Sequence, residues 1–280
     1  MKGSNTKPNC HLFSELEEAY HAVICDPHQT TAGEFFAQFG EDRILSRFFS
    51  ETTEGFFVEV GAYNGVEMSN TLALERRGWR GILVEADPEL AEQCRENRPN
   101  AVVVNCAATA PGGTTELGFS VAVASRGLSA VTMDKQRLGR IRHYTGSEDV
   151  RDIVVPARCL DHILAEQHVR HVDVLTVDVE GHEWEVLQGT DLSRWKPTLL
   201  IIERNSWFLP PRLLWRLHRH GYRYGFSTGP NDWFLRDERG NMAGLGYWPG
   251  MLTTQYGING LRYIKRSVLA HFRSVLSRRR

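Results

Sequence analysis

The stretch FFVEVGAYNG at residues 56–65 decides the fold that this sequence predicts. Apolar residues fill four of its first five positions, which is typical of a strand that is buried on both faces. Glu59 lies in this strand, and Gly61 and Gly65 follow its end. Because glycine lets the backbone turn and approach a ligand closely, the stretch predicts a strand that leads into a binding loop.

A second apolar run at residues 81–84 ends at Glu85, after a short predicted helix. This spacing predicts a βαβ unit with two parallel strands. A carboxylate at the end of the second strand of such a unit can accept hydrogen bonds from both hydroxyls of a ribose. The sequence therefore predicts one crevice for a nucleotide-like cofactor, between the glycine loop and Glu85.

Strands and helices continue to alternate along the chain. Strands are predicted at residues 56–60, 82–85, 101–106, 172–177 and 198–202, and helices at 41–49, 69–77, 88–97, 160–168 and 183–188. That alternation is typical of an α/β fold with a mostly parallel, Rossmann-like sheet. Residues 222–226 and 232–235 predict an antiparallel pair of strands that closes the sheet.

Three parts of the chain are predicted. Residues 1–54 form a leader and a helical cap, residues 55–236 form the α/β domain, and residues 237–280 form an extension. Within the domain, residues 111–156 interrupt the alternation with several glycines and two β-like pieces at 115–123 and 151–156. We expect an inserted hairpin and loop there, close to the substrate.

Composition excludes several classes of protein. With 41% hydrophobic and 24% charged residues, and no apolar run of about 18 residues, the chain is neither disordered nor membrane-spanning. Its five cysteines are scattered and form no CxxC pair, which argues against a zinc ribbon and a disulfide framework. Residues 1–13 lack the apolar core of a signal peptide, so the expected compartment is the cytoplasm.

Positive charge is concentrated at the end of the chain. Residues 261–280 contain seven Lys and Arg and no acid, and removing these cations from the net charge of −1 leaves −8 for residues 1–260. This balance argues against a nucleic-acid groove on the main domain. Apolar residues recur at helical spacing in the segment, which predicts a basic amphipathic helix. Such a helix either docks on the protein or contacts the inner face of an anionic membrane peripherally.

Polar residues also follow the later predicted strands. Asp178, Glu180 and His182 follow one strand in VDVEGHE, and Glu203 and Asn205 follow the next in IIERN. Open α/β sheets bind ligands outside the carboxyl ends of their strands, so we expect the acids at all four strand ends to surround one crevice. Each acid alone is equally well explained as a helix cap or as the partner of an arginine.

Several short motifs occur in a fixed order. They are AQFGED (37–42), VEVGAYNG (58–65), SNT (69–71), ILVEADP (82–88), NCAA (105–108), CLDHIL (159–164) and VDVEGHEWEVLQG (177–189). Together they resemble the FkbM-type S-adenosylmethionine-dependent methyltransferases over about residues 37–236, and the DVEGHE block is the most specific piece. The resemblance implies a class I methyltransferase fold, the cofactor S-adenosyl-L-methionine, and O-methylation of a carbohydrate or secondary metabolite.

The resemblance also implies which residues bind the cofactor. They are Glu59, Gly61 and Gly65 at its amino-acid end and sulfonium, Glu85 at the ribose, Asn105, Cys106 and Ala107 near adenine, and Gln38 and Asp42 over the pocket. The glycine loop lacks the GxGxxG spacing that places a pyrophosphate on a helix N-terminus. The residues thus favour S-adenosylmethionine over NAD.

A hydroxyl acceptor benefits from losing its proton during attack. His182 is the best single candidate for the base, with Asp178 or Glu180 either orienting it or replacing it. A surface histidine at the start of a helix is the simpler explanation of the same residue.

A second mechanism uses Mg²⁺, because Asp178, Glu203 and Asn205 are hard oxygen ligands at adjacent strand ends. Arg204 stands where a further acid is expected, so the oxygen cluster is incomplete.

Aromatic residues gather after the cofactor strands, at Trp207, Phe208, Trp233, Tyr247 and Trp248. Flat rings stack against sugars, although most aromatic side chains pack in cores. Two other functions stay open: a NAD-dependent oxidoreductase or epimerase, and a non-catalytic cofactor-binding scaffold with a membrane-attachment tail. A small-molecule or glycan acceptor is the expected partner.

Overall fold

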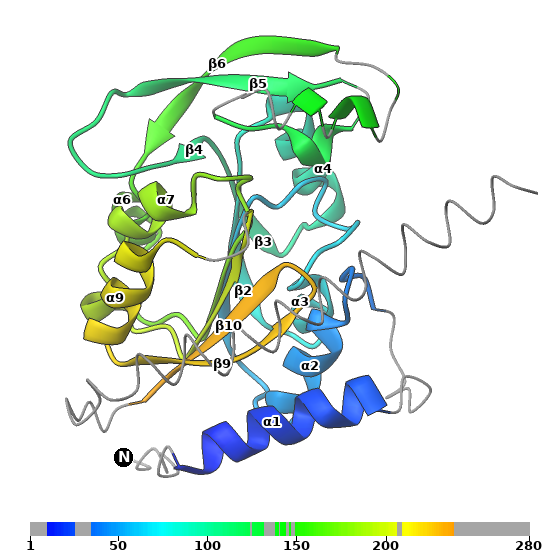
Figure 1. Cartoon of the computed structure of the whole chain (residues 1–280), viewed down its shortest axis with the longest axis vertical. Helices are drawn as coiled ribbons and strands as arrows, with labels where there is room; N and C mark the ends of the chain where they lie inside the picture. The colour runs from blue at the N-terminus through cyan, green and yellow to red at the C-terminus, as the bar shows by residue number, and fades with distance from the viewer. Residues whose placement is uncertain are drawn as a thin grey trace, which may run out of the picture.

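A seven-stranded sheet forms the centre of the protein, seen here in a computed structural model (Figure 1). The structure describes residues 10–25, 35–123, 125–131, 138–139, 141–143, 146, 149–205 and 209–237. The predicted basic helix at 261–280 and the aromatic residues Trp207, Phe208, Tyr247 and Trp248 lie outside these residues.

The sheet has the strand order β3-β2-β1-β7-β8-β10-β9. Its strands are β1 (Phe56–Val60), β2 (Arg80–Glu85), β3 (Ala101–Asn105), β7 (Val174–Val177), β8 (Leu199–Glu203), β9 (Tyr222–Thr228) and β10 (Asn231–Arg236). The first five strands of this order are parallel, and β10 is antiparallel to both of its neighbours. The predicted fold class, a mostly parallel Rossmann-like sheet with a closing antiparallel pair, is confirmed.

Helices cover both faces of the sheet (Figure 1). On one face lie α6 (Leu160–Glu166), α7 (Glu183–Gln188), α8 (Leu192–Trp195) and α9 (Pro211–Arg219). On the other lie α1 (Cys10–Cys25), α2 (Glu41–Phe48), α3 (Leu72–Glu75) and α4 (Pro88–Asn97). Sequence patterns predicted a helical cap within residues 1–54 without bounds for α1, missed α9, and predicted α3 as a longer helix over 69–77.

The sheet is buried on both faces because successive side chains of a strand point to opposite sides. In β1, Val58 and Val60 pack in the hydrophobic cluster beneath α6, α7 and α9, whereas Phe57 packs in the cluster beneath α1 and α2. This arrangement explains why the central strands are nearly continuous apolar runs. Trp233 of β10 is fully buried and belongs to the second cluster, so it is a core residue.

A small three-stranded sheet stands at the end of the main sheet where β3 ends (Figure 1). It contains β4 (Ala107–Ala108), β5 (Glu116–Ala122) and β6 (Val150–Arg158), and β5 pairs antiparallel with β6. The 3₁₀ helix η1 (Arg126–Leu128) follows β5. The two β-like pieces predicted within residues 111–156 are thus the two arms of one hairpin.

Within the described part of the chain, none of the helices combines the length and the apolar character that a membrane crossing needs.

Candidate active site

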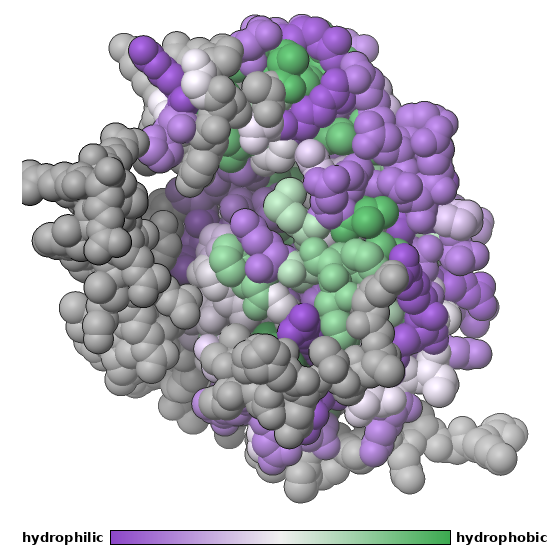
Figure 2. Space-filling view, turned by 90° about the vertical axis from the view of Figure 1, so that its right-hand side faces the viewer, coloured by the Kyte–Doolittle hydropathy of each residue, from purple (hydrophilic) through white to green (hydrophobic). Residues whose placement is uncertain are grey.

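A cavity of about 1120 Å³ opens at the carboxyl ends of β1, β2, β7 and β8. Residues of all four strand ends line it, together with residues of the inserted hairpin and of the segment before α2. Figure 2 shows one face of the molecule, where apolar side chains gather in the middle and polar ones surround them. The cavity lies where ligands bind in open α/β sheets, as the sequence predicts.

Gly61 brings the ends of β1 and β7 together. Its φ is +83°, and a Cβ at this position would lie 1.7 Å from the backbone oxygen of Asp178. A side chain therefore meets the neighbouring strand end before it meets any ligand. Gly61 lines the cavity, as predicted. The main reason for a glycine here is that the backbone of Asp178 occupies the space where a side chain would lie.

We expect Gly61→Ala to lower the free energy of unfolding by about 3 kcal/mol or more, because the added carbon requires strand β7 to move. Gly112 is a matched control, since its φ is +75° and no atom lies within 4 Å of the position of its Cβ. Gly112→Ala should cost only about 1–2 kcal/mol, the strain of the left-handed backbone. Urea unfolding followed by circular dichroism measures both, and equal losses would contradict the close-approach argument.

Glu59 is buried at the cavity wall and already has several partners. Its carboxylate accepts hydrogen bonds from Ser69 Oγ at 3.0 Å, from the Asn70 backbone N–H at 2.8 Å and from Thr71 Oγ1 at 2.6 Å. This explains the SNT motif and the short α3, because residues 69–71 bind Glu59 instead of starting a helix. Glu59 thus shapes the loop that faces the cavity, in addition to lining it.

Gly65, which the sequence analysis assigns to the cofactor, is not among the residues that line the cavity. Its carbonyl accepts a hydrogen bond of 2.9 Å from the buried guanidinium of Arg98. Arg98 also lies 2.5 Å from Glu75 and 3.7 Å from Glu59. Gly65 is required because a Cβ there would lie 2.9 Å from the Arg98 side chain, and its φ is +79°.

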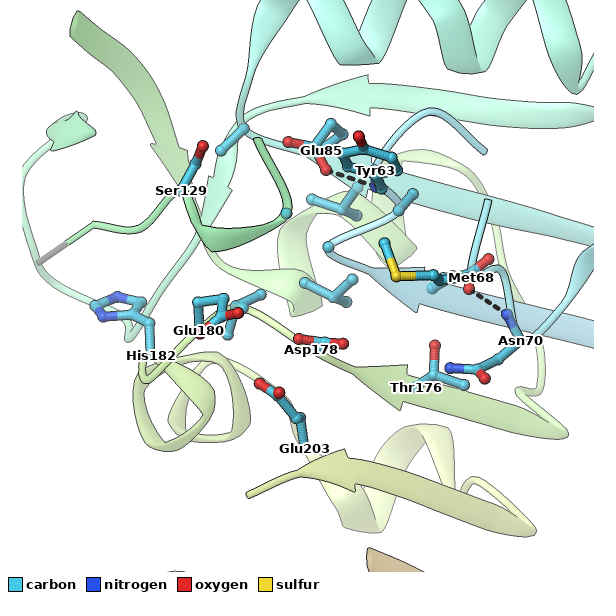
Figure 3. Close-up of a pocket in the computed structure, with 18 of the residues that line it drawn as sticks. Tyr63, Met68, Asn70, Glu85, Ser129, Thr176, Asp178, Glu180, His182 and Glu203 are labelled. Atoms are coloured by element: carbon cyan, nitrogen blue, oxygen red, sulfur yellow. Dashed lines mark hydrogen bonds between the residues drawn. The ribbon is translucent and has the colours of Figure 1, made fainter. Parts of the chain in front are cut away.

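Glu85 ends β2 and lines the cavity (Figure 3). One carboxylate oxygen accepts the N–H of Tyr63 at 2.9 Å, and the other accepts the N–H of Asp87 at 2.8 Å. Burial raises the pKa of Glu85 to about 7, although these hydrogen bonds oppose the shift. Each carboxylate oxygen has a second lone pair, so the fixed carboxylate can also accept ribose hydroxyls.

Of the three residues predicted to lie near adenine, two line the cavity. Cys106 and Ala107 line the cavity as predicted, beside the apolar side chains of Leu90 and Phe119. Asn105 does not line it. The Asn105 side chain instead donates hydrogen bonds to the carbonyls of Glu85 at 2.8 Å and Ala86 at 3.0 Å, and so it supports the end of β2.

The segment before α2 also differs from the prediction. Gln38 lines the cavity, but Asp42 is fully buried and does not. Asp42 accepts hydrogen bonds from the N–H groups of Phe36, Ala37 and Arg43, which fold the segment back on α2. Glu41, the neighbour of Asp42, lines the cavity instead. It accepts hydrogen bonds from Thr228 at 2.6 Å and Asn231 at 2.9 Å.

Asp178 and Glu203 form a pair at the ends of β7 and β8, where both line the cavity, Asp178 exposed and Glu203 partly buried, with their carboxyl groups facing each other in Figure 3. Desolvation raises the pKa of Asp178 to about 7 and that of Glu203 well above its usual range. Two adjacent carboxylates resist ionising together, so the pair holds a proton near neutral pH.

Asn205 supports this pair through its nitrogen. Its Nδ2 donates to Glu203 at 2.7 Å and to Glu183 at 3.0 Å, which turns the amide nitrogen toward the carboxylates. Among the residues that the structure describes, no group of three or more His, Cys, Asp and Glu side chains is placed to hold a metal ion. The Mg²⁺ site predicted at Asp178, Glu203 and Asn205 stays a prediction.

His182 lines the cavity at the start of α7. Its Nε2 lies 3.2 Å from Thr109 Oγ1, and its Nδ1 lies 3.6 Å from Glu185 Oε2. Burial lowers the pKa of His182, so the ring is neutral at pH 7. The carboxylate beside the ring is that of Glu185, whereas the sequence predicted Asp178 or Glu180 as its partner.

Gly189 explains the end of the VDVEGHEWEVLQG motif. A Cβ on Gly189 would lie 2.1 Å from the carbonyl oxygen of Thr109. The glycine therefore lets the end of α7 approach the residue whose hydroxyl contacts His182.

Three cavity residues other than glycine have positive φ angles: Tyr63 at 53°, Met68 at 60° and Glu180 at 53°. Side chains of this size rarely adopt that conformation, and strained backbone is concentrated at functional sites. None of these positions has a residue type that signals a left-handed conformation, so sequence patterns missed Tyr63 and Met68. They also missed Arg126 and Ser129, which reach the cavity from the inserted hairpin.

The charge of the cavity suits a cationic ligand. Among the described residues that line it, seven are Asp or Glu and two are Arg. Such a lining attracts the positive sulfonium of S-adenosylmethionine and repels a pyrophosphate. The volume, the carboxylate at the end of β2 and the apolar residues beyond it also fit this cofactor. Fold and site together define an α/β enzyme of the class I methyltransferase type.

A family model described as the methyltransferase FkbM domain matches residues 59–224. The chain therefore belongs to the FkbM methyltransferase family and is an S-adenosylmethionine-dependent methyltransferase. The predicted resemblance is confirmed. No curated protein sequence matches the chain.

Solved structures with a similar arrangement include a TehB-like SAM-dependent methyltransferase from Corynebacterium glutamicum. It is 10% identical, with a TM-score of 0.37, over 81% of this chain and 99% of that one. An O-methyltransferase from Bacillus cereus in complex with SAH is 12% identical, with a TM-score of 0.35, over 80% and 91%. The glycopeptide N-methyltransferase MtfA complexed with sinefungin is 12% identical, with a TM-score of 0.31, over 83% and 98%.

Proposed function

We propose that this methyltransferase acts on a hydroxyl group of a small-molecule or glycan acceptor, either a carbohydrate or a secondary metabolite. The observation that carries the proposal is the presence of proton acceptors in the cofactor cavity. His182 and the Asp178–Glu203 pair line the same cavity as Glu85. A hydroxyl group has to lose its proton to become a methyl ether, whereas a neutral amine attacks without a base.

Residues on the β1 and β2 side of the cavity would hold the cofactor. Glu85 would accept the ribose hydroxyls, Cys106 and Ala107 would contact adenine, and the backbone at Gly61 would lie near the sulfonium. When bound, S-adenosylmethionine supplies a methyl group on a positively charged sulfur. The carboxylates of the Asp178–Glu203 pair would stabilise the positive charge that moves from sulfur toward the acceptor oxygen.

His182 would then accept the proton of the acceptor. The Glu185 carboxylate favours the tautomer with a proton on Nδ1, in which Nε2 accepts a hydrogen bond from the Thr109 hydroxyl at 3.2 Å. Nε2 would act as the base once the acceptor hydroxyl takes the place of Thr109. Nε2 would take the hydroxyl proton as the acceptor oxygen receives the methyl group that bound S-adenosylmethionine would supply. Holding the oxygen and the methyl carbon in line is the remaining task of the cavity.

The rest of the lining supports an acceptor with many hydroxyl groups. Gln38, Asn70, Asn205 and Asn231 line the cavity, and carboxamides both donate hydrogen bonds to hydroxyls and accept them. Because acids are the majority of the charged lining residues, we do not propose an acceptor rich in phosphate. Peripheral membrane contact through residues 261–280 stays a prediction.

Calorimetric titration with S-adenosylmethionine and S-adenosylhomocysteine, with NAD as the comparator, tests the cofactor. We expect binding of both sulfur compounds and none of NAD. A panel of sugars, glycans and polyhydroxylated metabolites with cofactor labelled on the methyl carbon then tests the acceptor. Label in an ether, shown by its resistance to alkali, supports the proposal, and label only on nitrogen overturns it. Cofactor binding without any transfer would favour the scaffold function.

A further inference from the structure

Part of the inserted hairpin covers the cavity, and we call this part the roof. Arginines attach the roof to the start of α4. The roof is η1 with the residues that flank it, and Ser125, Arg126, Gly127, Leu128 and Ser129 line the cavity. In Figure 3, Ser129 lies on the Glu85 side of the cavity. The roof therefore belongs to the part of the cavity where the adenosine of the cofactor is proposed to bind.

The roof reaches across to the opposite wall. A Cβ on Gly127 would lie 3.7 Å from Cε of Met68, so η1 and the loop after β1 are in near contact. Met68 also lines the cavity, with a backbone φ of 60°. A ligand beneath these two segments has to separate them before it leaves on this side.

Two ion-pair partners at the start of α4, the N-cap residue Asp87 and Glu89, hold the roof in this position. One guanidinium nitrogen of Arg126 lies 3.2 Å from Asp87, and another contacts the carboxylate of Glu89. Arg151 of β6 lies 2.9 Å from the other oxygen of Glu89. Glu89 thus binds one arginine from each side of the insertion, and these hydrogen bonds lower its pKa, Arg151 being the larger cause and Arg126 the next.

We propose that Glu89 and Arg151 are positioning residues, which act through Arg126 to hold η1 over the cavity and so set the rate of cofactor exchange. The proposal rests on the proposed cofactor position beside Glu85. Neither Glu89 nor Arg151 lines the cavity. Their ion pair therefore stabilises the closed roof to the same extent whether or not a ligand is bound. An interaction of this kind changes the rates of entry and release together and leaves the affinity unchanged.

The size of the effect follows from the exposure of the pairs. The side chains of Glu89 and Arg151 are 52% and 51% exposed, so solvent screens their ion pair and its contribution is modest. Loss of both pairs of Glu89 should raise the opening rate about 3- to 10-fold. Arg151→Gln removes one of the two pairs, so its effect should have the same direction and be smaller.

The test is the binding kinetics of S-adenosylhomocysteine on the full chain, measured by surface plasmon resonance. For Glu89→Gln we expect kon and koff to rise together about 3- to 10-fold, with a Kd within about twofold of the unmodified protein. The matched control is Glu92→Gln, which breaks an exposed pair of 2.6 Å with Arg95 on the same helix without touching the insertion. Its two rates should stay unchanged.

Two results would overturn the proposal. Rates for Glu89→Gln equal to those of Glu92→Gln would show that the pairs do not hold the roof. A weaker Kd with an unchanged kon would show that Glu89 merely supports the binding site. Failure of the proposed function is recognised separately, because the unmodified protein would then not bind S-adenosylhomocysteine, or Glu85→Gln would bind it normally.

Discussion

Glu85→Gln is expected to weaken the binding of S-adenosylhomocysteine by about 100-fold. A hydrogen bond to a charged group contributes about 1.5–3 kcal/mol, and a carboxylate at this position would accept two from the ribose. The backbone N–H groups of Tyr63 and Asp87 fix the carboxylate in place, so it needs no reorganisation when the ligand binds. Isothermal titration calorimetry at pH 8 measures the loss.

The same carboxylate should make binding depend on pH. Because the pKa of Glu85 in the folded protein is about 7, the carboxylate form that accepts both hydroxyls is complete above that pH and is lost below it. The affinity of the unmodified protein should therefore fall as the pH drops from 8 to 6, by at most about tenfold per unit. Glu85→Gln should show no such fall from this group.

Asp232→Asn is the matched control for both measurements. Asp232 is another fully buried carboxyl group with a raised pKa, about 6, but it lies outside the cavity. Its replacement should change the stability of the protein and leave the affinity for S-adenosylhomocysteine unchanged. If Glu85→Gln weakens binding no more than Asp232→Asn does, Glu85 is not the ribose ligand.

Sequence patterns predicted the parts of this protein that depend on local composition. The strands of the main sheet are apolar runs, and the acids and glycines that come after each run mark where the strand ends. The position of Glu85 was predicted for the same reason, since the end of a parallel strand fixes the edge of the sheet at which its side chain lies. The helix over 88–97 was also predicted with its bounds, because Asp87 caps it and Pro88 begins it.

Features that depend on distant partners were not predicted. Gly65 and Asn105 were assigned to the cofactor, but their hydrogen bonds go to Arg98 and to the backbone at Glu85 and Ala86. Asp42 was assigned to the pocket and instead binds backbone N–H groups of its own segment. The insertion at 111–156 was expected close to the substrate, but no pattern near Arg126 singles it out as a residue that reaches the cavity. Residue type and spacing predict which residues lie at the edge of the sheet where ligands bind. Only the folded structure shows which of their polar groups are already hydrogen-bonded within the protein.

His182→Gln is expected to lower kcat about 100- to 1000-fold for the acceptor identified by the screen. A positioned general base contributes about this much, and glutamine cannot accept the proton. The Kd of S-adenosylhomocysteine should stay within about twofold, because the proposed cofactor ligands lie on the β1 and β2 side of the cavity. His171→Gln is the control, since this histidine also pairs with a carboxylate, Asp173 at 3.2 Å, but does not line the cavity.

The pH dependence of kcat separates His182 from the Asp178–Glu203 pair. Burial holds the pKa of His182 below its ordinary value of 6.5, so a rate that depends on it should fall only on the acid side of that pH. Glu185→Gln should move this fall to still lower pH, because the Glu185 carboxylate raises the pKa of the ring. A rate that falls already near pH 7, survives His182→Gln and is lost in Asp178→Asn would instead assign the proton to the carboxyl pair, since the pKa of Asp178 is about 7. The difference arises from burial, which lowers the pKa of a base that is neutral when free of its proton and raises the pKa of one that is charged.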